Sequence, residues 1–198
     1  MSNLDEHAII AAAEEYIRAL FASDAGGHDA AHSLRVRHNA MRIALSEPDC
    51  DRLVVELAAL LHDADDHKLF HTERCANARA FLEREGVEPE RTERICAAIE
   101  SVSFSKNRGR RPETLEGKIV QDADRLDAIG AVGVARCFAF GGAQARPMGE
   151  SIQHFYDKLL LLSAELNTES ARKLAAPRHA FLKAFLKEYC EETGEPSP

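Results

Sequence analysis

The sequence predicts an all-α protein, and three observations carry that prediction. Valine, isoleucine and threonine do not gather into alternating runs, and no Asn-Gly or Asp-Gly turn separates such runs. Apolar residues instead recur at the spacing of a helix with one buried face. Helix start signals precede several of these segments, and glycines follow them. We expect helices over residues 3–21, 29–45, 48–63, 72–86, 89–102, 114–140, 152–166 and 168–191.

Start signals stand before most segments in the first half of the chain. Asn3 and Glu6 have the spacing of a capping box at the start of the first helix. Asp29 and Thr72 are side chains suited to N-cap the second and fourth helices. Pro89 suits the first turn of the fifth helix, where the missing N–H costs nothing.

The third segment, which opens at Pro48-Asp49, is the most apolar of the first half. Leucine, valine and alanine fill a broad face of residues 53–61, which is typical of a buried helix. His62 and Asp63 follow directly, where polar groups are costly unless they are paired. One interpretation is a hydrogen-bonded core histidine beside a helix-end aspartate. The other is a pair of ligands to one cation.

In the second half of the chain, the sequence predicts one long helix followed by two further helices. From Thr114 the apolar pattern continues through Gly130 and Gly133, where small residues allow close helix contact. We expect a loop over the segment Gly141–Gly149. Pro177 is expected to kink or divide the last helix, because proline lacks the N–H of the helical ladder.

Composition excludes several classes of function. The chain has 198 residues and a formal net charge of −8, which argues against binding to a nucleic-acid polymer. No stretch approaches the roughly 18 apolar residues of a membrane span, and the N-terminus lacks the pattern of a signal peptide. The five cysteines are scattered without a CxxC pair. We expect free thiols, a cytoplasmic location and no membrane partner.

Three polar clusters interrupt the apolar helical pattern. They are the segments 27–36, 62–68 and 120–127. Within them the order His32, His62-Asp63 and Asp124 supplies two imidazoles and two carboxylates on three different helices. A zincin site would require glutamate directly after His28, and Asp29 stands there. Mixed nitrogen and oxygen ligands suit Mn, Fe, Ni, Co or Mg better than a structural zinc.

The order of these clusters resembles the H…HD…D signature of the HD-domain superfamily of metal-dependent phosphohydrolases. The motifs of the small stand-alone bacterial members are similar to GHDxxHxxRV, LHDxxDxK and DADRLDAIGAxGxAR. This chain reads GHDAAHSLRV from Gly27, LHDADDHK from Leu61 and DADRLDAIGAVGVAR from Asp122. The resemblance implies an all-α helical bundle with a metal site in its core. It also implies one domain over residues 1–198, with a core at about 23–142 and C-terminal helices at about 151–192 packed on it.

The resemblance also implies roles for single residues. The implied ligands of one divalent metal are His32, His62, Asp63 and Asp124. Asp66 is expected to orient or deprotonate the attacking water. Lys68 and Arg35 are expected to neutralise charge on the phosphoryl group, with Lys68 also in a catalytic role. Asp122 and Asp127 are then structural groups near the ligands. One departure from the family is the polar pair Asp65 and His67, where relatives tend to have apolar residues.

The implied reaction is hydrolysis of a phosphoester or phosphoanhydride, with a nucleotide as the expected substrate. The basic run Lys106–Arg111 is either a solvated loop or a segment that reaches a polyphosphate tail. The alternatives are a non-catalytic helical module of the same fold that binds nucleotides or regulates a partner, and a di-iron oxygenase. The oxygenase needs further ligands, and residues 72–103 contain no histidine. A homodimer is the default expectation for an oligomer.

Overall fold

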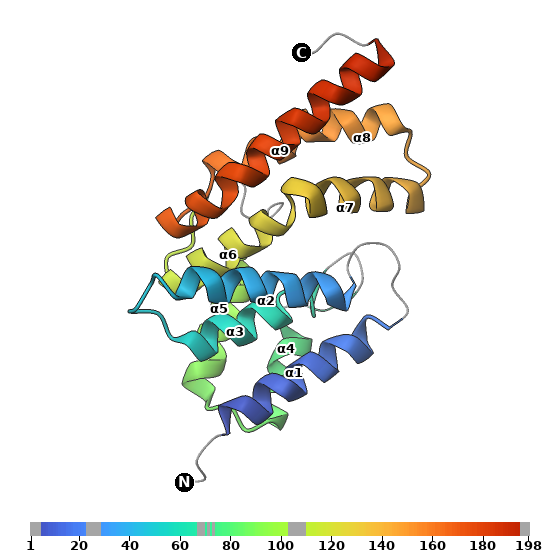
Figure 1. The fold of residues 1–198 in the computed structure, drawn as a ribbon. Helices are drawn as coiled ribbons and strands as arrows, with labels where there is room; N and C mark the ends of the chain where they lie inside the picture. Colours follow the sequence, from blue (N-terminus) through green and yellow to red (C-terminus); the bar gives the residue numbers. More distant parts are fainter. Residues whose placement is uncertain are drawn as a thin grey trace. The chain divides into compact units, whose positions relative to one another are not determined.

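The residues that the structure describes form helices and no β-strand, so the all-α prediction is confirmed. The structure is a computed structural model that describes residues 5–22, 29–66, 70, 72, 74–102 and 110–194. In chain order its helices are α1 (Glu6–Leu20), α2 (Ala30–Ala44), α3 (Arg52–Leu61), α4 (Ala76–Arg84), α5 (Pro89–Val102), α6 (Leu115–Asp127), α7 (Gly130–Ala143), α8 (Met148–His154) and α9 (Glu169–Thr193). The chain divides into two compact units, Met1–Asp124 and Arg125–Pro198 (Figure 1). The prediction of one domain over residues 1–198 stays a prediction.

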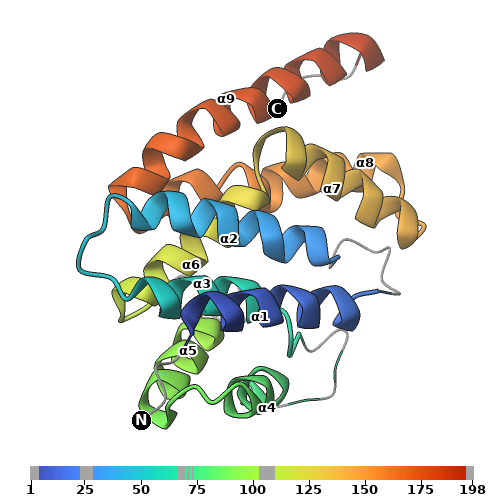
Figure 2. The same ribbon diagram turned by 60° about the horizontal axis from the view of Figure 1, so that its bottom comes forward.

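Helix α3 is the centre of the first unit. It packs against α1, α2 and α5, and Figure 2 shows α1 and α3 side by side. Every side chain from Leu57 to Leu61 is fully buried, as the apolar pattern predicts. Burial of apolar surface is the main favourable term in folding, so α3 is fixed at the core of this unit. The polar residues that follow it are thereby held at the interior.

Aspartates determine where the first three helices begin. The Asp5 carboxylate accepts a hydrogen bond from the Ala8 amide, while Asn3 lies outside the described residues. Asp29 is the N-cap of α2, as predicted. The third helix begins later than Pro48 because Asp51 is its N-cap. An aspartate at the N-cap satisfies amides that have no partner inside the helix.

A half-buried arginine on α2 ties the first three helices together. Arg37 donates from Nε to Glu56 on α3 at 2.6 Å and from Nη1 to Glu14 on α1 at 2.6 Å. One guanidinium therefore bridges two carboxylates on neighbouring helices, which is the geometry that arginine favours. The contact fixes the positions of α1 and α3 along α2.

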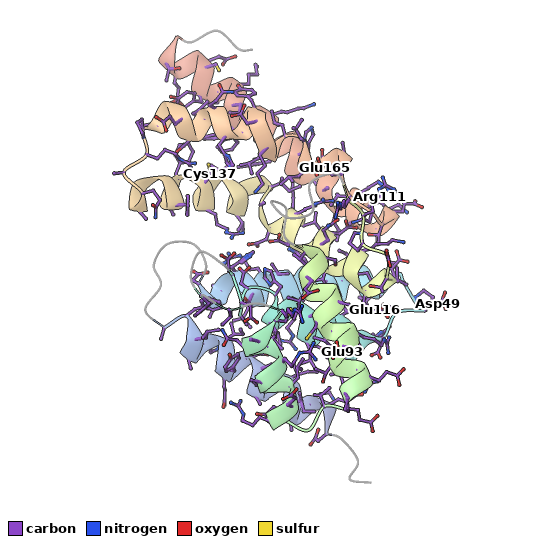
Figure 3. All side chains as sticks on the ribbon, turned by 180° about the vertical axis from the view of Figure 1, so that it is seen from behind. Asp49, Glu93, Arg111, Glu116, Cys137 and Glu165 are labelled. Atoms are coloured by element: carbon purple, nitrogen blue, oxygen red, sulfur yellow. The ribbon has the colours of Figure 1, made fainter. Side chains whose placement is uncertain are left out.

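A second set of ion pairs joins α5 to the helices around it. Arg94 lies 2.9 Å from Asp51 at the start of α3 and 3.2 Å from Glu116 on α6. Arg79 on α4 forms a two-point pair with Glu93 on α5. Figure 3 shows Glu93 and Glu116 on their helices as seen from behind. Exposed pairs contribute little to stability, so these contacts mainly orient the helices.

Helix α4 begins at Ala76, and the prediction that Thr72 caps it is wrong. Arg74 and Cys75 precede the helix with φ values of 54° and 53°, in the left-handed region. This reversal of the chain starts α4 later than the sequence pattern indicates. The end is as predicted: Gly86 has a φ of 74°, which glycine adopts without strain.

The long helix expected from Thr114 is two helices, α6 and α7, bent by 70°. Gly130 has a φ of 76° at the break, and a Cβ there would lie 3.0 Å from the Arg178 side chain. The apolar period continues across the bend, so the sequence pattern does not reveal it. No single helix in the described ranges is long and apolar enough to cross a membrane, and α6 with α7 meets that requirement only as a bent pair.

The second unit has an aromatic core between α7, α9 and the π-helical turn at Phe155–Leu159. The ring centroid of Phe185 lies 5.6 Å from that of Phe155 and 5.9 Å from that of Phe138. The predicted loop at Gly141–Gly149 is shorter, because α7 ends at Ala143 and α8 starts at Met148. Helix α9 runs through Pro177 undivided. Pro177 is exposed, so the carbonyl that loses its partner can face water.

Candidate metal centre

The first imidazole of the site comes from the first turn of α2. His32 is 2 % exposed, and its amide donates to the Asp29 carboxylate at 2.9 Å. The N-cap contact therefore fixes the start of the helix at the residue that carries the ring. Because α2 packs against α3, His32 faces the end of α3.

The second imidazole stands at the C-cap of α3. The Nδ1 atom of His62 lies 2.9 Å from the carbonyl oxygen of Ala59. A carbonyl only accepts hydrogen bonds, so Nδ1 carries the hydrogen in this contact and the lone pair of a neutral ring is on Nε2. This is how ligating histidines are usually oriented, by a hydrogen bond from the other ring nitrogen.

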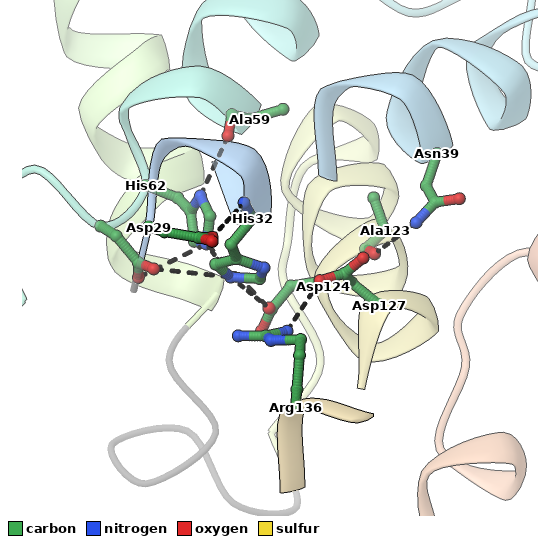
Figure 4. Close-up of polar contacts among 10 residues, drawn as sticks. Asp29, His32, Asn39, Ala59, His62, Ala123, Asp124, Asp127 and Arg136 are labelled. Carbon is green, nitrogen blue, oxygen red and sulfur yellow. Dashed lines mark hydrogen bonds and ion pairs between the residues drawn. The ribbon is translucent and has the colours of Figure 1, made fainter. Parts of the chain in front are cut away.

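Four side chains converge at the two Nε2 atoms (Figure 4). The Nε2 atoms of His32 and His62 are 3.2 Å apart. The carboxylate of Asp63 lies 3.5 Å from Nε2 of His32 and 3.4 Å from Nε2 of His62. Asp124 on α6 lies 3.4 Å and 4.0 Å from the same two atoms. The structure therefore brings together the four residues that the resemblance implied, all within the Met1–Asp124 unit.

The donor set fits a divalent cation. Two neighbouring ligands of an octahedral ion at about 2.1 Å are separated by about 3 Å. The ligand atoms of His32, His62 and Asp124 all lie within 4.8 Å of one another, and could hold a metal ion. Two imidazole nitrogens with carboxylate oxygens suit first-row transition metals and Mg.

The site is buried on its imidazole side and open on its carboxylate side. The side chains of both histidines are 3 % exposed, whereas that of Asp63 is 14 % and that of Asp124 is 28 % exposed. A water or a small anion can therefore approach next to Asp124. The backbone at Asp124 is held from α2, because Asn39 donates to the Ala123 carbonyl oxygen at 3.4 Å in a buried contact.

Asp65 holds the turn that follows α3 against the start of α4. Its carboxylate accepts from the amide of Asn77 at 2.9 Å and from that of Ala78 at 3.0 Å. The Asn77 side chain donates in return to the Ala64 carbonyl oxygen at 2.8 Å. The polar residue that departs from the family pattern thus caps α4 from outside the helix. No local sequence signal reveals this role, because the partners lie 12 and 13 residues further along the chain.

The other predicted site residues lie close to the ligands in the chain. Asp66 is half-buried, and its amide donates to the Asp63 carbonyl oxygen at 3.1 Å, so both belong to one turn. Arg35 is half-buried on α2, one turn beyond His32. Lys68 lies outside the described residues, as does most of the basic run, residues 106–109. Its last two members, Arg110 and Arg111, are exposed and line a cavity of about 320 Å³.

Helix α6 also carries polar residues that are buried, unlike Asp124. Asp127 is 2 % exposed and lies 2.8 Å from Nη1 of Arg136 on α7. Asp122 is fully buried. Arg125 contacts both the backbone oxygen and the carboxylate of Glu165. The pair of Asp127 with Arg136 links the two helices across the bend.

Comparison with known proteins identifies the family. The model of the HD domain matches residues 29–129 of this chain, about half of its length. The chain belongs to the HD-domain family. The match contains the whole sequence order His32, His62-Asp63 and Asp124, so the resemblance that the motifs indicate is confirmed.

Small bacterial HD-domain proteins are similar to this chain over nearly their whole length. The uncharacterized protein YpgQ of Bacillus subtilis (strain 168) is 40 % identical over 182 residues, 87 % of this chain and 88 % of YpgQ. A crystal structure of YpgQ in complex with ADP has a TM-score of 0.81 at 34 % identity and covers 94 % and 96 % of the two chains. An HD-superfamily hydrolase from Bacillus thuringiensis has a TM-score of 0.78 at 34 % identity and covers 96 % and 100 %.

Proposed function

We propose that this HD-domain protein is a metal-dependent phosphohydrolase that acts on a nucleotide. The proposal rests on one observation. The side chains of four residues converge at a site that is partly exposed to solvent: His32, His62, Asp63 and Asp124. The complex of YpgQ with ADP supports a nucleotide, because ADP carries the phosphoanhydride and phosphoester bonds that such an enzyme would cleave.

The four converging side chains would hold one divalent ion, which we expect to be Mn, Ni, Fe, Co or Mg. An ion held by these residues would supply a bound water of lowered pKa and a positive charge beside a phosphoryl oxygen. The hydrogen bond from His62 to Ala59 keeps the ligating nitrogen free of hydrogen. The exposed edge at Asp124 leaves room for the substrate.

Residues beside the ligands would perform the proton transfer and hold the substrate. Asp66 shares the turn of Asp63 and is proposed to orient the attacking water and accept its proton. Arg35 is proposed to bind the phosphoryl group through its two-pronged guanidinium. Lys68 is proposed to neutralise charge that develops in the transition state.

The test pairs metal content with activity. Wild type and the variant His62→Ala/Asp63→Ala are purified without chelator, and bound metal is measured by elemental analysis. Both proteins are then assayed with Mn, Ni, Co and Mg on nucleoside mono-, di- and triphosphates and on cyclic dinucleotides. Release of phosphate and of pyrophosphate is followed separately, because the product identifies the bond. The matched control is Asp49→Ala, a substitution of an exposed aspartate in the loop before α3.

The proposal expects about one metal ion per wild-type chain and loss of metal and hydrolysis together in the double variant. Asp66→Asn should keep the metal and lower turnover by at least about a hundredfold, the range for losing a general base. Full metal occupancy without hydrolysis of any substrate would favour the non-catalytic module. Absence of metal from the wild type after reloading would overturn the site.

A further inference from the structure

An open cavity of about 320 Å³ lies in the first unit, where α5 ends and α6 begins. The C-terminal end of α5 and the segment 110–114, which leads into α6, line this cavity. Its volume is at the lower end of the range for small-molecule sites. The polar lining consists of two arginines, two glutamates and two hydroxyl side chains: Arg110, Arg111, Glu100, Glu113, Ser101 and Thr114.

Close packing holds the backbone around this cavity in place. Gly117 on α6 leaves no room for a side chain, because a Cβ there would lie 2.8 Å from Oγ of Ser101 and 3.0 Å from Cβ of Pro112, which is buried. The Thr114 hydroxyl accepts a hydrogen bond from the Gly117 amide at 3.1 Å. Gln121, one turn further along α6, donates to the Ser101 carbonyl oxygen at 2.9 Å. Both segments that line the cavity are therefore fixed against α6.

Two guanidinium groups of this lining have no partner of their own. In the part of the chain that the structure describes, neither Arg110 nor Arg111 forms an ion pair or a hydrogen bond. Arg91 and Arg94 on α5, by contrast, both pair with the Asp51 carboxylate. Guanidinium groups bind phosphate through parallel N–H donors. Two of them side by side in the sequence, in a chain of net charge −8, favour an anionic ligand at this cavity.

The glutamates of the lining narrow the class of ligand. Glu100 and Glu113 contribute carboxylates, which only accept hydrogen bonds when they are ionised. They repel a ligand that carries nothing but negative charge, such as a bare polyphosphate. A ligand that has one anionic group and several hydroxyl groups matches both kinds of lining residue. Phosphate monoesters of sugars and nucleosides have this combination.

We propose that this cavity is a second binding site, for a phosphate monoester that also carries hydroxyl groups. Arg110 and Arg111 bind the phosphate, and the two glutamates accept hydrogen bonds from the hydroxyl groups. The arginine side of the cavity is separate from the proposed metal centre. Thr114 precedes Asp124 by ten residues along α6, which corresponds to about 15 Å at a rise of about 1.5 Å per residue. The second site therefore does not depend on the proposed hydrolysis.

The experiment measures binding where the metal centre cannot contribute. AMP, inorganic phosphate and adenosine are titrated separately into full-length His62→Ala/Asp63→Ala by calorimetry. Wild type with chelator is a second background, which keeps the test valid if the double variant folds poorly. Arg110→Ala/Arg111→Ala is then introduced into both backgrounds. The matched control is Arg42→Ala/Arg52→Ala, which removes two other exposed arginines and the same charge.

Hydrogen exchange locates the bound ligand. Amides that a ligand covers or holds in place exchange more slowly. With AMP present, we expect slower exchange at the last turn of α5 and the first turn of α6. The amides of α2, which lie outside the cavity lining, should be unaffected.

The proposal expects AMP to bind in both backgrounds and more tightly than either inorganic phosphate or adenosine. Arg110→Ala/Arg111→Ala should weaken AMP binding by at least about tenfold, the effect of losing one hydrogen bond to a charged group. Arg42→Ala/Arg52→Ala should leave the affinity unchanged. Equal affinities of the two arginine variants, or absence of AMP binding from both backgrounds, overturns the second site. Failure of the wild type to bind metal would overturn the metal centre alone, because these titrations contain no bound metal.

Discussion

At the scale of single residues, the candidate site depends on neighbouring groups that hold its four converging side chains in place. The Ala59 carbonyl sets the tautomer of His62, the Asp29 cap sets the start of the helix that carries His32, and Asn39 holds the backbone beside Asp124. Each contact uses a backbone group that would otherwise lack a partner or shift position. The geometry of the proposed ligands therefore depends on residues outside the converging set.

Asp65 allows a test of this dependence. Asp65→Ala removes the carboxylate that caps α4, so we expect a loss of about 1 kcal/mol in the free energy of unfolding. We also expect weaker Mn²⁺ binding, because the turn that carries Asp63 loses its anchor. Urea unfolding and metal titration measure the two effects. Asp49→Ala is the control, and equal behaviour of the two variants would contradict the anchoring role.

At the scale of helices, the sequence predicted starts and ends where the signal is local. Asp29, Pro89 and Gly86 act within one turn of their own positions, and the structure has them as predicted. The start of α4 and the break between α6 and α7 depend instead on distant partners. Apolar periodicity is equal on both sides of the bend at Gly130, so it predicts one helix where the chain has two.

The bend at Gly130 leads to a prediction with an internal control. Gly130→Ala places a Cβ against the Arg178 side chain at a φ of 76°, and we expect it to lower the free energy of unfolding by about 1–2 kcal/mol. Gly142→Ala, within α7, meets nothing within 4 Å and has ordinary helical angles. It should stabilise the protein by about 0.5–1 kcal/mol, because alanine favours the helix. Urea unfolding of both variants measures the two changes in the free energy of unfolding. Changes in the same direction would contradict this explanation.

Helix α8 contributes a pH dependence of stability. Burial, followed by the nearby Lys158 and Arg146, lowers the pKa of His154, while Asp157 acts in the opposite direction. The unfolded chain therefore binds a proton more readily than the folded chain. The stabilisation is present above the ordinary pKa of about 6.5 and is lost as the pH falls through the lowered folded value.

His154→Gln removes the imidazole that binds this proton, so the free energy of unfolding should depend less on pH. Urea unfolding of wild type and variant at pH 7.5, 6.5 and 5.5 should show the smaller loss of stability in the variant as the pH falls. The free energy of unfolding changes with pH at different slopes in the two proteins. The difference cannot exceed about 1.4 kcal/mol per pH unit, the value for one proton. If the stabilities of the two proteins changed equally with pH, His154 would bind its proton equally well in the folded and the unfolded chain.

At the scale of the molecule, motif order predicted which four side chains converge at the candidate site, and sequence reasoning missed the contacts that support them. The order His32, His62-Asp63, Asp124 is readable because each motif is short and ordered along the chain. The cap that Asp65 provides and the contact of the Cys75 sulfur with the Cys96 backbone oxygen join residues that no motif connects. Such contacts are fixed by how α4 packs on α5, which a single sequence does not state.

The division into two units gives the last prediction. Both histidines and both carboxylates of the proposed metal centre lie within Met1–Asp124, so metal binding should stabilise that unit directly. At a Mn²⁺ concentration 100 times the dissociation constant, the gain is about 2.7 kcal/mol.

Hydrogen exchange of the α3 amides should then slow by up to about a hundredfold, because these amides exchange when their unit opens. The α9 amides, which lie in Arg125–Pro198, should slow much less. Exchange by mass spectrometry with and without Mn²⁺ measures both helices, and His62→Ala/Asp63→Ala should abolish the effect. Equal slowing of α3 and α9 would show instead that the two units open as one.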